Sequence, residues 1–149
     1  ELVPLPFVHM EAPVYLRGRA RRGPTFRETV LMHAVARLVL HPLVPNIQTS
    51  WVKLGVAGAR ACLDAGANDL GGTLMNESIS RAAGAAHGQE MGPAEIAALA
   101  RMMGRTARQR STLYEKVPAE RRRAAGRAPA LAPVVETPAT RFAHGEKAA

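Results

Sequence analysis

The stretch AGANDLGGTLMNES, residues 65–78, decides how the rest of the chain is interpreted. Its apolar residues predict a short strand, yet Asn68 and Asp69 stand in its middle and Gly71 and Gly72 at its end. Polar side chains are costly in a buried strand unless they have partners. Paired glycines weaken a strand and mark the close approach of backbone to another group. A polar ligand lying against the two glycines would explain both features.

Three strand-like segments alternate with helical patterns along the chain. We expect strands at residues 2–8, 46–53 and 67–72, and helices at residues 25–40, 56–65 and 93–104. Such alternation favours an α/β fold, with parallel strands in chain order and the first two helices on one outer face. Because three strands alone leave two exposed edges, the sequence indicates either a very small domain or the C-terminal part of a larger, truncated barrel.

The helix at residues 25–40 has the clearest signals. Thr25 and Glu28 have the spacing of a capping box, and Pro42 stands just past the end. We expect its core stripe to consist of Phe26, Val30, Ala34 and Leu38, widened by Leu31 and Val35. The next two helices are expected to end at Gly66 and Gly104, and Met32, Met102 and Met103 to be core residues.

The positive charge is concentrated towards the C-terminus. The net charge is +8, but residues 1–100 hold nine Lys/Arg against eight Asp/Glu, and residues 101–149 hold eleven against four. We therefore divide the chain into a folded portion, residues 1–116, and a basic Ala/Pro/Arg-rich tail, residues 117–149, that is largely disordered apart from one short helix. Because the folded portion is nearly neutral and has few aromatic residues, a nucleic-acid-binding module is the weaker interpretation.

The single cysteine limits the other function classes. Cys62 excludes a disulfide framework, suggests a reducing, cytoplasmic compartment, and is interpreted as a small core residue. The histidines lack zinc-ligand spacing, and neither a phosphate loop nor a dinucleotide fingerprint is present. No run of 18 apolar residues predicts a membrane span.

The candidate site residues follow from the expected strands. Functional groups of α/β barrels collect at the C-terminal ends of the strands, so we expect a polar ligand there. The predicted ligand-binding residues are His9, Asn46, Gln48, Trp51, Asn68, Asp69, Gly71, Gly72, Thr73 and Glu77. Capping of a strand explains His9 equally well, packing explains Trp51 better, and Lys53 fits a surface charge. Bonds to a neighbouring loop are the less favoured explanation of Asn68 and Asp69. No catalytic residue and no metal ligand is assigned.

Four segments resemble the C-terminal half of FO synthases, radical S-adenosylmethionine enzymes of deazaflavin (coenzyme F-420) biosynthesis. They are PLPFVHMEAP, NIQTSWVKLG, GANDLGGTLMNESISRAAGAAHGQ and RQRSTLY, spread over Leu2 to Tyr114. The resemblance is to the tyrosine-using subunit, or to the second half of the fused enzyme. Related radical enzymes of the futalosine menaquinone route share the elements GANDLGGTLM, NIQ and SWVKLG. The FO branch is more closely resembled by SISRAAGAAHG and EAPVYLRGRARRGPT.

The resemblance implies a (β/α)8 TIM barrel that holds a 4Fe-4S cluster through three cysteines in C-x3-C-x2-C spacing. That motif is absent here, so the cluster cysteines are expected upstream of Glu1, and this chain alone is expected to bind no cluster and to cleave no S-adenosylmethionine. The implied reaction transfers a 4-hydroxybenzyl group from L-tyrosine to 5-amino-6-(D-ribitylamino)uracil, with the companion FO synthase activity fused or separate.

Three alternatives remain open at the level of the sequence. A futalosine-route radical enzyme is the runner-up within the class, and the loop around His87 would distinguish it. The other two are the nucleic-acid-binding module and a non-catalytic interaction domain. The leading interpretation expects small-molecule partners, with neither nucleic acid nor membrane.

Overall fold

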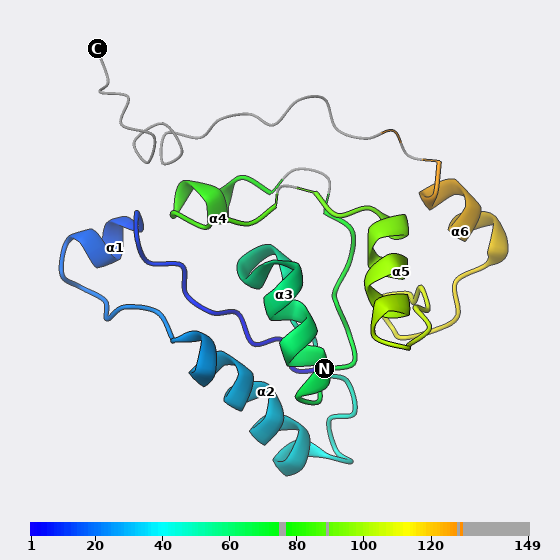
Figure 1. The fold of residues 1–149 in the computed structure, drawn as a ribbon, viewed down its shortest axis with the longest axis horizontal. Coiled ribbons are helices and arrows are strands. Elements are labelled where there is room, and N and C mark those ends of the chain that lie inside the picture. Colours follow the sequence, from blue (N-terminus) through cyan, green and yellow to red (C-terminus); the bar gives the residue numbers. More distant parts are fainter. Residues whose placement is uncertain (75–76, 89, 128, 130–149) are drawn as a thin grey trace.

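The computed structural model describes residues 1–74, 77–88, 90–127 and 129, and helices dominate this part of the chain (Figure 1). The helices are α1 (Pro13–Leu16), α2 (Phe26–Leu40), α3 (Trp51–Asp64), α4 (Ile79–Ala82), α5 (Pro93–Met102) and α6 (Ala119–Ala125). Sequence patterns did not predict α1 and α4, which are single turns. The short helix expected in the segment after residue 117 is α6, and residues 130–149 lie outside the described residues.

Three extended segments lie side by side in chain order, as predicted. Leu2 pairs with Ile47 and Gln48 pairs with Asp69, both in the parallel direction. Backbone hydrogen bonds run from Gln48 N to Leu2 O at 2.9 Å and from Thr49 N to Asp69 O at 2.8 Å. Within the described residues the parallel pairing is limited to these two bridges, so the parallel order is confirmed but a closed barrel is not seen.

The strand expected at residues 46–53 is wrong at its C-terminal end. Trp51, Val52 and Lys53 form the first turn of α3 instead, and the helix expected at residues 56–65 therefore begins five residues earlier. A break at Gly55 separates this turn from the rest of α3, with φ 66° and ψ −179°. Only glycine adopts this conformation readily, which is why the helical pattern read from the sequence started after it.

Helix α2 begins with the predicted capping box. The Thr25 hydroxyl accepts from Glu28 N at 3.2 Å, and the Glu28 carboxylate accepts from Thr25 N at 2.7 Å. These hydrogen bonds, led by the one to the Thr25 backbone, hold the pKa of Glu28 below its ordinary value. The bonds satisfy N–H groups that the helix start would otherwise leave unpaired.

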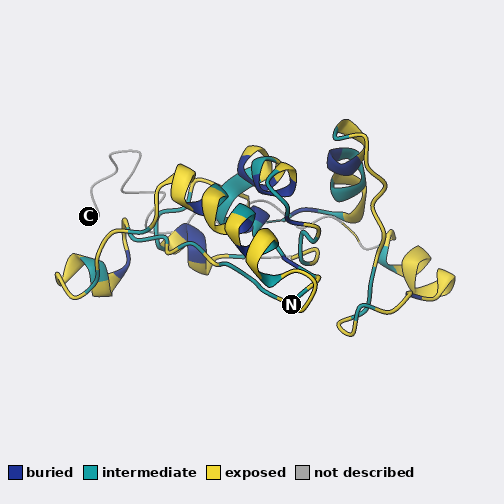
Figure 2. Ribbon diagram, turned by 90° about the horizontal axis from the view of Figure 1, so that it is seen from below, coloured by how far each residue is buried: buried dark blue, intermediate teal, exposed yellow. Residues whose placement is uncertain are grey.

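The predicted core stripe of α2 is mostly wrong. The buried residues of α2 are Thr29, His33 and Ala36, whereas Phe26, Leu31, Val35 and Leu38 are 59%, 49%, 52% and 82% exposed. Figure 2 shows this outer face of α2 as largely exposed. Met32 and Met102 are also exposed, against expectation, while Met103 packs on the core. The described residues supply α2 with neighbours on one side only, and that side is more polar than the sequence pattern suggested.

Two apolar clusters hold the helices against the extended segments. The first joins α2 and α3 to the middle segment through Ala36, Cys62 and Ile47. Cys62 is fully buried, as predicted, and burial raises the pKa of its thiol. The second cluster joins Trp51, Val52 and Ala59 to Met91, with Ile96 of α5 packed against it. Helices α2 and α3 therefore cover one face of the three segments, as the alternating pattern predicted.

The predicted helix ends at glycines are confirmed. Gly66 follows α3 with φ 119°, and Gly104 follows α5 with φ 66°. Helix α5 begins with Pro93, and the Glu95 carboxylate accepts from Gly92 N at 2.7 Å. No helix among the described residues is long and apolar enough to span a bilayer.

Candidate functional site

Asn46 and Asn68 lie together at the N-terminal ends of their segments, away from the expected ligand. Asn68 Oδ1 accepts from Arg37 Nη2 at 2.8 Å and from Ile47 N at 2.9 Å, and its Nδ2 donates to Asn46 Oδ1 at 3.3 Å. Arg37 also donates to the backbone oxygens of Gly66 and Pro45 at 2.8 Å each. The two amides thus attach α2 to the edges of the middle and third segments.

Asp69 has its partners within the chain. Its Oδ2 accepts from Arg110 Nε at 2.5 Å and from the Tyr114 hydroxyl at 2.8 Å, and Arg110 Nη2 lies 2.5 Å from it in an ion pair. Its Oδ1 accepts from Gly71 N at 2.7 Å. The side chain is 8% exposed and fully hydrogen-bonded, so a ligand is not needed to explain why a carboxylate sits in this strand-like stretch.

Arg110 and Tyr114 belong to a loop that folds back onto the first and third segments. The Glu1 carboxylate is a second acceptor for the single Tyr114 hydroxyl proton, and the Arg110 guanidinium lies over the Tyr114 ring at 4.1 Å. Tyr114 has φ 64°, a conformation that is uncommon without glycine. Burial first, and then the hydrogen bonds to Glu1 and Asp69, raise the pKa of Tyr114 well above its ordinary value of 10.0. The Asp69 cluster, formed by Glu1, Asp69, Arg110 and Tyr114, therefore anchors this loop.

The two glycines differ in their surroundings. Gly71 has φ 74°, and a Cβ there would lie 2.7 Å from Gln48 Nε2, so Gln48 is the group that approaches the first glycine. At Gly72 a Cβ would meet nothing within 4 Å, and its carbonyl accepts from Trp51 Nε1 at 3.1 Å. The Gln48 amide forms no side-chain hydrogen bond to any described residue, so its polar atoms are available beside Gly71.

His9 and Thr73 occupy the margins of this region. His9 Nδ1 accepts from Gly23 N at 3.1 Å, and its ring meets Tyr15 edge-on at 4.7 Å between centroids. A Cβ at Gly23 would lie 1.9 Å from Phe7 O, so this close approach of the loop requires glycine. With Nδ1 accepting, Nε2 of a neutral His9 carries the proton and is free to donate. Thr73 is exposed.

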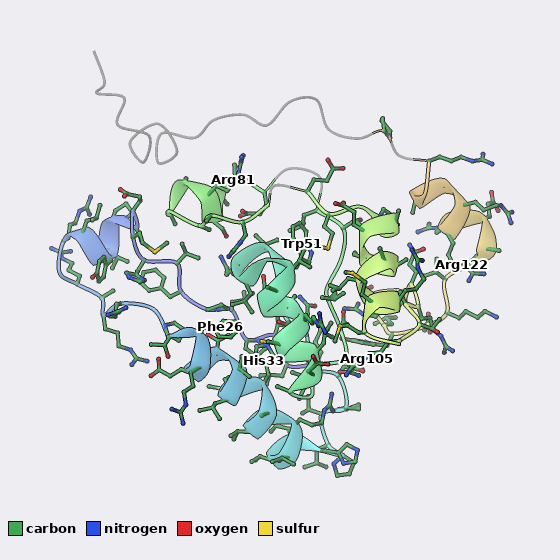
Figure 3. The ribbon with its side chains drawn as sticks, in the orientation of Figure 1. Phe26, His33, Trp51, Arg81, Arg105 and Arg122 are labelled. Atoms are coloured by element: carbon green, nitrogen blue, oxygen red, sulfur yellow. The ribbon has the colours of Figure 1, made fainter. Side chains whose placement is uncertain are left out.

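A cationic group that sequence reasoning missed lies around α4. Lys53 Nζ donates to Ser80 Oγ at 2.6 Å, and the Glu77 carboxylate accepts from Ser80 N at 2.9 and 3.2 Å. Arg81 is 9% exposed and donates through Nε to Glu77 O at 3.2 Å. Figure 3 labels Arg81 beside α4 and Trp51 at the start of α3. The backbone bond from Glu11 N to Ala83 O, 2.9 Å long, holds α4 near the end of the first segment.

The ten predicted residues thus form several small groups rather than one. Gln48, Trp51, Gly71 and Gly72 lie together, Asn46 and Asn68 form a second group, and Asp69 belongs to the Asp69 cluster. Arg110 and Tyr114 were missed, although the segment RQRSTLY that contains them had drawn attention by resemblance. A groove of about 910 Å³ between residues 2–6, residues 21–25 and α2 contains none of the ten. Among the described residues no group of His, Cys, Asp and Glu could hold a metal ion, and an iron–sulfur cluster finds no ligand set there.

Comparisons with known proteins match most of the chain. The family model described as the CofH/MqnC C-terminal region matches residues 1–122. The FO synthase of Streptomyces avermitilis is 55% identical over 140 residues, which are 91% of this chain and 16% of that protein. The FO synthase of Nocardia farcinica is 57% identical over 117 residues, which are 78% of this chain and 14% of that protein.

A shorter relative matches the same region. The 5-amino-6-(D-ribitylamino)uracil–L-tyrosine 4-hydroxyphenyl transferase of Methanopyrus kandleri is 60% identical over 117 residues, 78% of this chain and 32% of that protein. The chain therefore spans less than a third of the length of these relatives. No solved structure matches.

Proposed function

The chain belongs to the CofH/MqnC C-terminal family, and from this membership we propose that it is the C-terminal portion of a radical S-adenosylmethionine transferase. The proposed enzyme moves a 4-hydroxybenzyl group from L-tyrosine to 5-amino-6-(D-ribitylamino)uracil during FO and coenzyme F-420 biosynthesis in the cytoplasm. The observation that carries this proposal is the 55–60% identity to proteins named FO synthase and 5-amino-6-(D-ribitylamino)uracil–L-tyrosine 4-hydroxyphenyl transferase. The proposal includes a companion FO synthase activity, fused or separate.

The proposed fold of the whole enzyme is a (β/α)8 barrel, to which residues 1–116 contribute the last strands and helices. Two observations support this proposal. Each bridge between the three extended segments is parallel. Large apolar side chains on the outer face of α2, such as Leu38 at 82% and Val39 at 70% exposure, fit a surface that packs against further protein. The 4Fe-4S cluster would then be bound by cysteines elsewhere in the longer protein.

The residues proposed to face the substrates are those whose polar groups the chain leaves available. They are Gln48, which lies beside Gly71; Gly72, whose Cβ direction is open; His9, through Nε2; and Thr73 at the following loop. Glu77 is proposed to support this loop, because its carboxylate accepts from Ser80 N. The uracil and the ribityl chain both offer hydrogen-bonding groups that an amide such as Gln48 matches. Trp51 supports this surface through its bond to Gly72 O. We propose supporting roles for Asn46, Asn68 and Asp69, because their hydrogen bonds are made within the chain.

The reaction can be tested with a full-length enzyme that contains this chain, reconstituted anaerobically. With S-adenosylmethionine, L-tyrosine, the diaminouracil and a companion FO synthase activity, we expect FO to form and to be detected by its fluorescence. Turnover of a futalosine-route substrate in place of the diaminouracil would contradict the proposal and assign the chain to the other branch of its family.

The proposed substrate surface can be tested with Gln48→Ala in the same enzyme. Loss of a hydrogen bond to a buried substrate group costs about 1–3 kcal/mol, so we expect kcat/KM for the diaminouracil to fall by about five- to 150-fold. Gln109→Ala is the matched control, because Gln109 is exposed on the loop before Arg110. Equal kinetics for the two variants would exclude Gln48 from the site.

A further inference from the structure

Arg81 is a nearly buried cation whose charge has no partner among the described residues. Only 9% of its surface is exposed, and the Nη2 atom is shielded from solvent without a hydrogen bond. Its Nε donates to the backbone oxygen of Glu77, and neither terminal nitrogen donates to any described residue. None of the ion pairs among the described residues involves Arg81.

This arrangement is unfavourable for the chain by itself. A guanidinium remains protonated at any ordinary pH, so Arg81 cannot relieve its burial by losing a proton. An ion taken out of water without a counter-ion costs several kcal/mol. Arg110 shows the usual solution in the same molecule, since its side chain is 23% exposed and its guanidinium is paired with Asp69 and Glu1. Arg81 is therefore placed where an anion from outside the described residues would stabilise it.

Ser80, the residue before Arg81, bonds to one further cation, Lys53, and to one carboxylate, Glu77. Lys53 Nζ reaches the hydroxyl of Ser80, the residue next to Arg81, and Ser80 is 2% exposed. The nearby Glu77 carboxylate bonds to the Ser80 backbone N–H and forms no ion pair with Arg81. The two cations come from different elements, α3 and α4, and α4 lies near the end of the first segment.

We infer that Arg81, with Lys53 beside it, binds the α-carboxylate of an amino-acid ligand. The planar fork of a guanidinium matches a carboxylate and binds it more strongly than a neutral donor does. This inference rests on the proposed function, which requires two ligands with such a carboxylate, L-tyrosine and S-adenosylmethionine. The chemistry of carboxylate recognition is the same for both ligands.

Paired ligands that differ by the carboxylate test this assignment directly. In the full-length reconstituted enzyme, equilibrium binding is measured for L-tyrosine against tyramine and for S-adenosylmethionine against its decarboxylated form. We expect the wild type to prefer the carboxylate-bearing member of at least one pair by about tenfold or more, the size of a charged hydrogen bond. Arg81→Met should reduce that preference to nearly one, and the affected pair identifies the ligand.

Two further variants complete the test. Arg60→Met is the matched control, because Arg60 is exposed on α3 and should leave both preferences unchanged. Arg81→Lys keeps the charge but loses the fork, so it should retain only part of the preference, and it carries the test if Arg81→Met does not fold. The inference would be overturned if Arg81→Met kept the full wild-type preference for the carboxylate-bearing member of both pairs. The same result in Arg81→Lys would overturn it if Arg81→Met does not fold.

Failure of the proposed function gives a different result. A wild-type enzyme that binds neither L-tyrosine nor S-adenosylmethionine would contradict the proposed function itself. The Arg81 assignment alone would be contradicted by a different result. In that case the wild type binds both ligands and prefers the carboxylate-bearing members, and the Arg81 variants show the same preference.

Discussion

Asp69 and Arg81 are charged residues at similar depth, one on each side of the segment that begins with the double glycine. The Asp69 side chain is 8% exposed, and Arg81 is 9% exposed. The Asp69 carboxylate accepts three hydrogen bonds, from Gly71 N, Arg110 Nε and the Tyr114 hydroxyl, and forms an ion pair with Arg110 Nη2. To the described residues Arg81 donates one hydrogen bond, to the backbone oxygen of Glu77, four residues away.

The difference separates a structural role from a ligand-binding one. A buried charge with all its partners in the chain stabilises the fold, and removing it leaves another charge unpaired. A buried charge without partners destabilises the chain by itself and is explained by what it binds. Both residues carry the polarity expected of a binding site, and only their partners distinguish them.

The largest effect should come from Asp69→Ala, which leaves Arg110 without its main counter-ion. We expect the local opening free energy of residues 65–74 and 108–117 to fall by about 3 kcal/mol, the usual cost of breaking a buried ion pair from one side. Hydrogen–deuterium exchange of the full-length enzyme measures it. Glu115→Ala, at an exposed position of the same loop, is the control. If the two variants exchanged alike, the Asp69 cluster would not be structural.

The next effect concerns the turn that carries Lys53 towards α4. Gly55→Ala would force alanine into φ 66° and place its Cβ 2.6 Å from His87 Nδ1. We expect faster hydrogen–deuterium exchange over residues 50–58, because the local opening free energy should fall by about 2 kcal/mol. Gly104→Ala is the control, because Gly104 has the same φ but no atom within 4 Å of the added Cβ. An equal cost at both positions would mean that the His87 contact contributes nothing.

Tyr114→Phe tests the neutral member of the Asp69 cluster through pH. Losing its hydrogen bonds should cost about 1 kcal/mol at neutral pH. The pKa of Tyr114 in the folded state lies above the ordinary 10.0. Above pH 10 the unfolded state therefore loses this proton while the folded state keeps it, which favours unfolding. The advantage of the wild type over Tyr114→Phe should thus be constant below about pH 9 and shrink above pH 10. Chemical unfolding midpoints between pH 7 and 11 measure it, and an advantage that grows above pH 10 would contradict the assignment.

The smallest effect on folding should come from Arg81→Met. Replacing an unpaired buried cation by an apolar side chain of similar length is neutral or stabilising by about 1 kcal/mol, even though ligand binding suffers. The change in stability is measured without ligands, by hydrogen–deuterium exchange over residues 77–86 and by the thermal unfolding midpoint. A loss of stability as large as that of Asp69→Ala would show that Arg81 has a partner in the longer protein, and the contrast between the two residues would disappear.

Local signals in the sequence predicted much of the fold. The capping box of Thr25 and Glu28, Pro93 at the start of α5, and the glycines after α3 and α5 each act on neighbouring residues, so the sequence alone is sufficient to find them. The parallel order of the three segments followed from their alternation with helices. The burial of Cys62 followed from its residue type and place on a helix.

Predictions that depended on neighbours were less successful. The apolar pattern of α2 indicated a helix, but it did not indicate that Thr29 and His33 would be its buried residues. The start of α3 was missed because Gly55 interrupts the helical pattern after one turn. The resemblance to a known family supplied the chemistry, yet it could not sort the ten candidate residues by what each one touches.

The sequence by itself determined the family, the order of the elements and the polar residues around the double glycine. The tertiary structure decided which of those residues have partners. Asp69 is paired because a loop 41 to 45 residues further along the chain returns to it, and such a contact leaves no local pattern. Arg81 is unpaired because no described carboxylate returns to it in the same way. Burial and pairing are properties of contacts between distant residues, so the two charges looked alike in the sequence and differ in the fold.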